Sequence, residues 1–264
     1  MWHVHASVII GILLLGMGYA LAARRLRKRP LPRQWAAFCG ALVTILAALD
    51  GPVDALADAR LFSAHMAQHL LLTLVMPPLL LLGLPAWMLR PVLRVPGLAA
   101  VARRLTNPIV AFAVYNALLI AIHLPAIFDR MVRDEPTHIA LHLALMATGV
   151  LMWWPLLSPL PELPRLAYPG QMLYLFLLLI PMAAVSAPIA LGTTVIYPWY
   201  AEGPHPAHLS ALADQQLGGL LMWVGAGLYL MAVFSASFFR WARRDDRDEP
   251  SVGRPVARTR TAWG

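Results

Sequence analysis

Long apolar stretches alternate along this chain with short polar segments. A helix that crosses about 30 Å of hydrocarbon needs roughly 20 residues with few charges. Seven stretches approach this length, at residues 6–22, 34–49, 62–82, 107–124, 138–156, 171–195 and 215–238. The pattern predicts an all-α fold, a polytopic integral membrane bundle of seven transmembrane helices.

The composition and the placement of charge agree with a membrane protein. Of the 264 residues, 59% are hydrophobic and 13% are charged, which is unlike an average soluble domain. Of the 21 basic residues, 18 fall on one side of the predicted spans, and only Arg60, Arg130 and Arg133 fall on the other. Because cytoplasmic loops collect positive charge, the N-terminus is expected outside and the C-terminus inside.

The net charge of +8 therefore reflects topology and an attraction to anionic membrane lipid. It is not accompanied by a nucleic-acid-binding motif, so no nucleic-acid partner is expected. Residues 1–239 are predicted to form the membrane domain, and the charged residues 240–264 a disordered cytoplasmic tail.

Within the third span, Pro77 and Pro78 should kink or open the helix, as should Pro181 and Pro188 in the sixth.

Two histidine pairs stand out, His65/His69 and His138/His142, each at the start of an apolar span. Residues four apart share one face of a helix, so both rings of a pair can face one centre. Ionisable groups within membrane helices are costly and usually face the bundle interior. These pairs, with His123 near the end of the fourth span, predict a metal site at the outer side. The alternative is that the rings hydrogen-bond to water and loop carbonyls at the membrane interface.

Four more histidines lie on the predicted outer flanks and are additional candidate ligands: His3, His5, His205 and His208. Cys39 is the single cysteine, so a pair of cysteine ligands cannot form. Met66 and Met146 are further candidates, and Met222 also lies in an apolar span. Thioether and imidazole ligands together favour copper, especially Cu(I), while zinc remains an alternative. Each methionine on its own can equally be core filler.

Asp214 lies at the outer start of the seventh span. Its carboxylate could orient a ligand imidazole from the second coordination shell. It could instead cap the N-terminus of that helix.

Two sequence motifs resemble a known family. The stretch from Ser63 to Leu72 with the following 77–85, and the stretch from Asp214 to Trp223, are similar to signatures of the multi-span CtaG-type cytochrome c oxidase assembly factors. The His138/His142 pair with residues 152–155 fits the same pattern, and the resemblance covers the second to the seventh span. It implies a multi-pass protein of the bacterial cytoplasmic membrane that matures haem-copper oxidase in the respiratory chain.

The resemblance also implies the site and the partners. His65, His69, His138, His142 and Asp214 are the implied site residues, and copper insertion into the oxidase catalytic subunit is the implied role. We expect a non-enzymatic assembly factor or metallochaperone that receives copper from a periplasmic or extracellular donor. Two alternatives remain at this point: a seven-span zinc-dependent membrane hydrolase with Asp214 or Asp54 as general base, and a haem-binding membrane electron carrier.

Overall fold

The computed structural model describes residues 5–202 and 209–248, and within these ranges its regular structure is entirely helical. The elements, in chain order, are α1 (Ala6–Arg25), α2 (Pro32–Leu49), α3 (Pro52–Asp58), α4 (Phe62–Leu70), η1 (Leu71–Val75), α5 (Met76–Gly83), α6 (Ala86–Leu93), α7 (Leu98–Leu105), α8 (Pro108–Ile122), α9 (Pro125–Arg133), α10 (Glu135–Leu157), α11 (Tyr168–Leu191), η2 (Pro198–Ala201), α12 (Ala211–Leu220), η4 (Leu221–Gly225) and α13 (Ala226–Asp248). Here η2 is a 3-10 helix, and η1 and η4 are π-helical turns.

Six helical stretches of the described chain are long and apolar enough to cross a membrane, so the protein is a multi-pass membrane protein. A seventh span requires α7 and α8 together, and this pair is bent by 71°. The fourth expected span is thus shorter than predicted: the Asn107 side chain caps α8 at Ile109 and Val110, and the helix ends before Pro125, which disfavours helical backbone at the residue before it.

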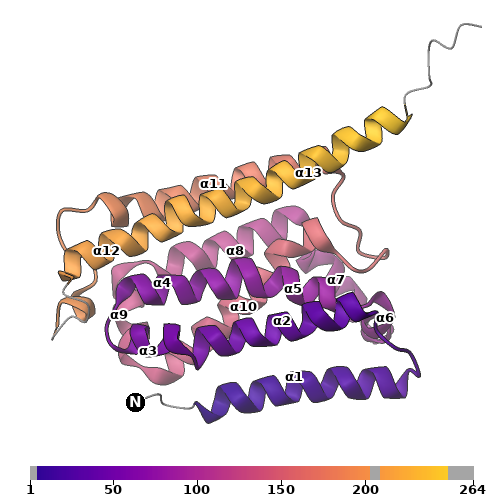
Figure 1. Cartoon of the computed structure of the whole chain (residues 1–264), viewed down its shortest axis with the longest axis horizontal. Coiled ribbons are helices and arrows are strands. Elements are labelled where there is room, and N and C mark those ends of the chain that lie inside the picture. Colours follow the sequence, from indigo (N-terminus) through magenta and orange to yellow (C-terminus); the bar gives the residue numbers. More distant parts are fainter. Residues whose placement is uncertain (1–4, 203–208, 249–264) are drawn as a thin grey trace, which may run out of the picture.

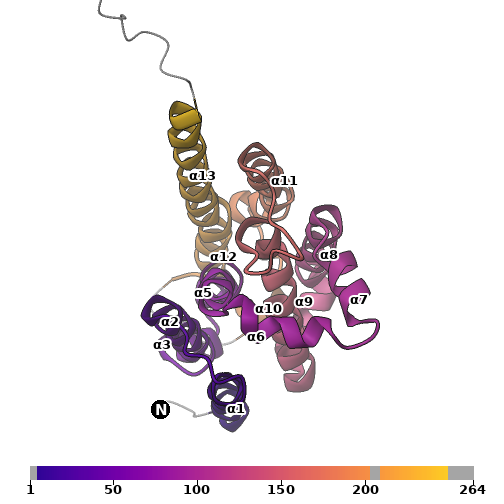
Figure 2. The ribbon, with the colours of Figure 1, turned by 90° about the vertical axis from the view of Figure 1, so that its right-hand side faces the viewer.

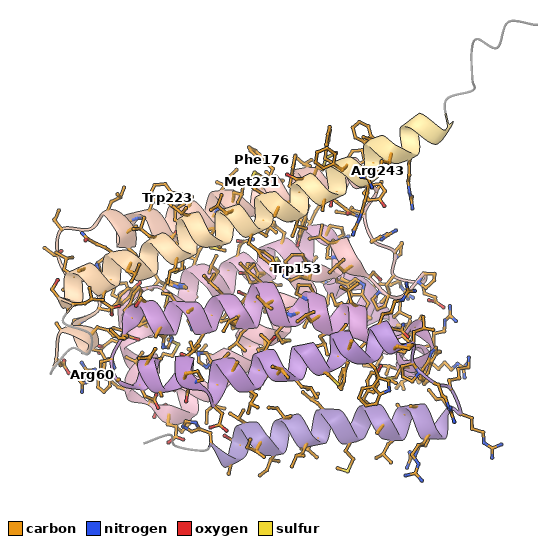
Figure 3. The ribbon with its side chains drawn as sticks, viewed as in Figure 1. Arg60, Trp153, Phe176, Trp223, Met231 and Arg243 are labelled. Carbon is orange, nitrogen blue, oxygen red and sulfur yellow. The ribbon has the colours of Figure 1, made fainter. Side chains whose placement is uncertain are left out.

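The helices form one bundle with α1 at its edge (Figures 1 and 2). The strongest packing joins α2 to α5, α10 to α8 and α5, α11 to α12 and α13, and α12 to α4. Large apolar side chains on the outer helix faces remain exposed, among them Leu13, Val43, Phe176 and Leu228, and Figure 3 shows the side chains around the bundle. Such a belt is what lipid contact requires.

The two ends of the bundle differ in chemistry. One end, which we call the histidine end, is formed by α3, α9 and η2 together with the starts of α4, α10 and α12. The other end holds α6, α7 and the arginine-rich α1–α2 connection. Helix α13 continues to Asp248, beyond residue 239 where the membrane domain was expected to end, and residues 249–264 of the expected tail lie outside the described residues.

The proline pair of the third span opens its helix as expected. The π-helical turn η1 ends at Val75, two residues before the Pro77–Pro78 pair. Because Pro77 has no N–H, the carbonyl of Thr73 loses its helical donor. The indole Nε1 of Trp153 on α10 donates to this carbonyl at 2.8 Å, so a neighbouring helix satisfies the break. In contrast, α11 runs as one α-helix across Pro181 and Pro188.

We predict that Trp153→Phe destabilises the bundle by about 1–3 kcal/mol through the orphaned Thr73 carbonyl. The matched control is Trp154→Phe, which removes the neighbouring indole N–H with its longer 3.3 Å bond to Leu163. Thermal unfolding in detergent measures both variants. Equal losses of stability would contradict the role given to Trp153.

Candidate metal centre

Three histidines from two helices converge at the histidine end. One ring nitrogen from each of His65 on α4 and His138 and His142 on α10 lies within 4.8 Å of the other two. The ring of His65 stacks on that of His138, with centroids 5.3 Å apart and planes 15° apart. Nitrogen ligands lie about 2.0–2.1 Å from a bound metal such as zinc, so two ligands of one ion are separated by about 3–3.5 Å. Small side-chain adjustments therefore suffice for this three-histidine group to share one ion.

His69 and His123 lie directly beside the three-histidine group. The Nε2 atoms of His65 and His69 are 3.0 Å apart, and the His69 ring is 5.2 Å from His142 and 5.9 Å from His123, between centroids. The structure thus brings together all five histidines that the sequence placed within or at the ends of spans. This requires the third, fourth and fifth spans to meet, which the ring contacts and the packing of α10 on α8 and η1 show.

The tautomer of His123 follows from its hydrogen bond. Its Nδ1 lies 2.7 Å from the backbone oxygen of Leu119, and a carbonyl can only accept. Nδ1 therefore carries the proton, and Nε2 presents a lone pair. A metal-binding histidine is commonly oriented by such a bond from its other ring nitrogen.

Several ring nitrogens in this cluster are buried without a hydrogen-bond partner among the described residues. They are Nδ1 of His69 and Nε2 of His123, His138 and His142. His65, His69, His123 and His142 are each at most 6% exposed. An unsatisfied buried polar atom costs about 1–3 kcal/mol, and such a group calls for an explanation. A bound cation provides one, because it accepts the lone pairs of neutral imidazoles.

An aromatic layer covers the histidines. Phe128 on α9 is fully buried, with its ring 5.5 Å from His65 and 6.2 Å from His123. It packs against Tyr197, whose hydroxyl donates to the backbone oxygen of His123 at 2.9 Å. The loop 192–201 therefore closes over the site together with α9.

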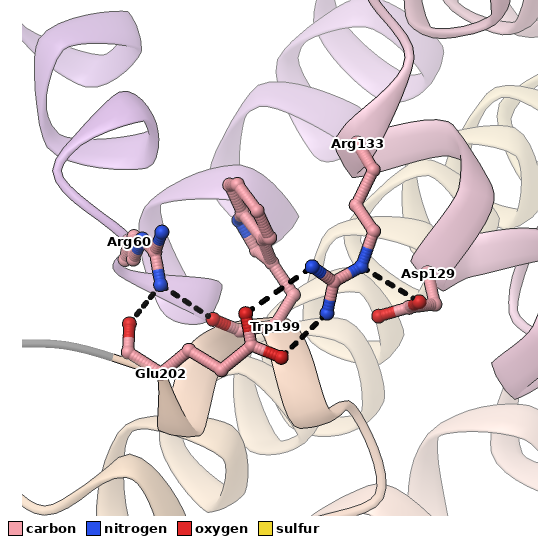
Figure 4. Close-up of polar contacts among 5 residues, drawn as sticks. All are labelled: Arg60, Asp129, Arg133, Trp199 and Glu202. Atoms are coloured by element: carbon pink, nitrogen blue, oxygen red, sulfur yellow. Dashed lines mark hydrogen bonds and ion pairs between the residues drawn. The ribbon is translucent and has the colours of Figure 1, made fainter.

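A polar network at the surface ties α9 to this loop (Figure 4). Arg133 donates to Asp129 at 2.8 Å and to both carboxylate oxygens of Glu202, and its guanidinium lies 4.9 Å from the Trp199 ring centroid. The guanidinium of Arg60 lies over the same Trp199 ring, 4.1 Å from its centroid, and donates to the backbone oxygens of Trp199 and Glu202. The hydrogen bonds from Arg133 lower the pKa of the Glu202 carboxyl, so this connection stays ionised at neutral pH.

Asp214 caps a helix, but not its own. Its carboxylate accepts hydrogen bonds from the backbone N–H of Phe62 at 2.6 Å and of Ser63 at 3.2 Å, and from the Ser63 hydroxyl. Helix α4 begins after Leu61, which has no side chain able to cap it, while Ser210 caps α12. Two roles were expected as alternatives for Asp214, orienting an imidazole or capping its own helix. The observed contacts of its carboxylate cap α4 and so position the helix that carries His65 and His69.

The glutamines around these motifs hold backbone in the same way. Gln215 accepts from the N–H of Ile196 at 2.6 Å, and Gln216 donates to the oxygen of Gly192 at 2.9 Å. Gln68 donates to the oxygen of Ala48 and to the Asp54 carboxylate, both at 2.8 Å. The polar residues around the histidines thus hold the backbone near the site, and the histidine side chains supply the nitrogen ligands.

The methionines predicted as ligands pack elsewhere. Met66 is fully buried in the core beside Phe62 and Gly218, and Met146 packs against the cluster of Ala41, Ile45 and Met76. Met182 on α11, which sequence reasoning did not single out, lines a small cavity with His69 and His123, as does Met222. No spacing in the sequence marks Met182, because its position depends on how α11 packs.

A second group with metal-ligand spacing lies nearby on the N-terminal side. Ligand atoms of His5, Asp54 and Asp58 lie within 4.8 Å of one another. The Nδ1 of His5 is 3.4 Å from Asp54 and 3.7 Å from Asp50, an arrangement that an ion pair with a protonated imidazole also explains. His3, His205 and His208 lie outside the described residues.

Comparison with known proteins gives one family. A family model described as cytochrome c oxidase caa3 assembly factor matches residues 17–244. Proteins of Mycobacterium bovis and Mycobacterium tuberculosis, both named as uncharacterized, are each 30% identical over 269 residues, covering 93% of this chain and 40% of the relative. An uncharacterized protein of Mycobacterium leprae is 24% identical, with the same coverage. The chain thus spans about 40% of the length of these curated relatives. No solved structure matches it.

We predict that Asp214→Ala both destabilises the protein and weakens metal binding, because each donor orphaned at the start of α4 costs about 1–3 kcal/mol. The matched control is Ser210→Ala, which removes a more exposed cap four residues away and should cost about 1 kcal/mol. Thermal unfolding and metal titration of both variants make the comparison. If Asp214→Ala loses no more of either property than Ser210→Ala, the capping role is wrong.

Proposed function

This chain belongs to the family of cytochrome c oxidase caa3 assembly factors, and on that premise we propose that it binds copper among its buried histidines and passes it to the catalytic subunit of the oxidase. The centre consists of His65, His138 and His142, with His69 and His123 beside them. We further propose that the protein lies in the bacterial cytoplasmic membrane with the histidine end outside, where a periplasmic or extracellular donor can reach it.

The observation that supports copper most is the set of buried ring nitrogens without partners. Neutral imidazoles bind a cation without adding charge, so the loaded centre carries only the charge of the ion. Burying charge in an apolar interior is expensive, which favours a monovalent ion over a divalent one. Imidazole is a good ligand for copper, and the absence of cysteine from the three-histidine group leaves the ion less tightly held. These properties suit the binding and release of Cu(I).

Release to a partner can proceed by ligand exchange. Each bond from copper to an imidazole nitrogen breaks as a bond to a ligand of the partner forms, and the oxidation state stays unchanged. His138 is the partly exposed member of the three-histidine group. Beside the group, α9 with Phe128 is fastened to Glu202, at the end of η2, by the Arg133–Glu202 contact. An oxidase subunit or a copper donor that disturbs this contact would gain access to the histidines.

The two other functions considered from the sequence gain less support. A zinc hydrolase needs a free carboxylate as general base, but both oxygens of Asp214 are engaged by the start of α4. Asp54 accepts from Gln68 and belongs to the separate group with His5. A haem carrier needs space for a macrocycle between its axial ligands, whereas the rings of His65 and His138 stack directly on each other.

We predict that His65→Ala/His69→Ala and His138→Ala/His142→Ala each lower copper affinity by about tenfold or more, since loss of supporting residues alone costs about 10–100-fold. The copper content of the purified full chain is measured after anaerobic loading. The copper content of the oxidase is measured in cells whose oxidase assembly depends on this protein. The matched control is Gln171→Ala, which removes a buried polar side chain at the opposite end of the bundle.

Both double variants should lose the same metal, and the Gln171 variant should keep it. Two results together would overturn the proposal: purified protein that binds no copper, and normal oxidase copper content with both histidine pairs removed.

A further inference from the structure

A small internal cavity adjoins the histidine centre. Its volume is about 10 Å³, close to the space that one water molecule needs. The polar and sulfur-bearing residues that line it are His69, Thr73, Tyr115, His123, Met182 and Met222. No carboxylate is among its lining residues, and its walls come from α4, η1, α8, α10, α11 and η4. An ion held there would meet only neutral groups.

Two imidazoles at this cavity have nitrogens free for a ligand. The Nε2 of His123 is buried without a partner in the described chain, and its lone pair is available because Nδ1 donates to Leu119. The Nδ1 of His69 is likewise buried and unpartnered, while its Nε2 approaches His65 at 3.0 Å. The His69 ring therefore lies between the cavity and the three-histidine group.

The two methionines supply the complementary ligand type. Met182 and Met222 are 4% and 2% exposed, and they reach the same cavity from different helices. Thioether sulfur is a soft donor that selects Cu(I) over harder divalent ions. The pairing of two imidazoles with two thioethers is chemically distinct from the three-histidine group, which has nitrogen donors only.

Both π-helical turns of the described residues border this cavity. Thr73 belongs to η1 and Met222 to η4. A π turn widens a helix by one residue and occurs frequently at functional sites. Here each of the two turns contributes a residue to the lining of the same cavity.

We propose that this cavity is a second copper position, specific for Cu(I), formed by His69, His123, Met182 and Met222. The inference rests on the proposed copper-binding function and extends it. His69 lies between the two positions, so an ion moves from one to the other as each of its bonds to His65, His138 or His142 breaks and a bond to a cavity ligand forms, with no change of oxidation state. The competing occupant is a water molecule hydrogen-bonded to the same two imidazoles.

The test is X-ray absorption at the copper edge on the full chain in detergent, loaded anaerobically with one and then two equivalents of Cu(I). The variant is Met182→Leu/Met222→Leu, a change that nearly conserves side-chain volume. The matched control is Met66→Leu/Met146→Leu, which changes two methionines that pack away from the cavity. Gel filtration and thermal unfolding show whether both double variants are folded. If a double variant does not fold, its two single variants are measured in its place.

We expect sulfur scattering to appear with the second equivalent in the native protein and in the control. It should be absent from Met182→Leu/Met222→Leu, whose affinity for the second equivalent falls about tenfold or more while the first equivalent binds unchanged. A native protein that binds copper through nitrogen alone, or sulfur scattering that survives in this variant, overturns the second position and leaves the proposed function standing. Protein that binds no copper at any ratio overturns both.

Discussion

The bond between the Asp214 carboxylate and the N-terminus of α4 determines where the histidine centre forms. Helix α4 starts after a leucine and has no cap of its own, so its first backbone N–H groups depend on a side chain from α12, about 150 residues further along the chain. A carboxylate at a helix N-terminus also meets the positive end of the helix dipole. By holding this end of α4 at a defined place in the bundle, Asp214 sets His65 and His69 opposite His138 and His142.

The same bundle tolerates irregular backbone because neighbouring helices complete its hydrogen bonds. Trp153 donates a hydrogen bond to the Thr73 carbonyl that Pro77 leaves without a donor. Gln215 and Gln216 form hydrogen bonds with the backbone of the loop that follows α11. Irregular backbone at membrane depth is acceptable only where protein or a cavity satisfies it. The breaks in the third and seventh spans therefore accompany the histidine centre and its cavity, while the outer helices α1 and α2 remain regular.

The helical membrane fold and the placement of each histidine pair on one helix face could be predicted from the chain, because apolar length and a spacing of four residues are local properties. The meeting of the third, fourth and fifth spans could not, because it depends on packing between helices. The short α8 was partly foreseeable, since Asn107 and Pro108 mark its start and Pro125 its end. The role of Asp214 was not, because the helix that it caps is remote in sequence. The methionines could not be assigned for a related reason. Met182 was not predicted to lie beside the histidines, whereas Met66 and Met146 were predicted as ligands and pack elsewhere. These spans are apolar nearly all round, so which face of each helix turns inward depends on packing between helices.

Whether the buried imidazoles form one copper centre can be measured by anomalous diffraction at the copper edge, from crystals of the full chain grown with Cu(I) under anaerobic conditions. We expect an anomalous peak among the ring nitrogens of His65, His138 and His142, at about the 2.0–2.1 Å that imidazole nitrogen keeps from a bound metal. Copper found only at His5, Asp54 and Asp58, or no peak near the histidine end, would contradict it.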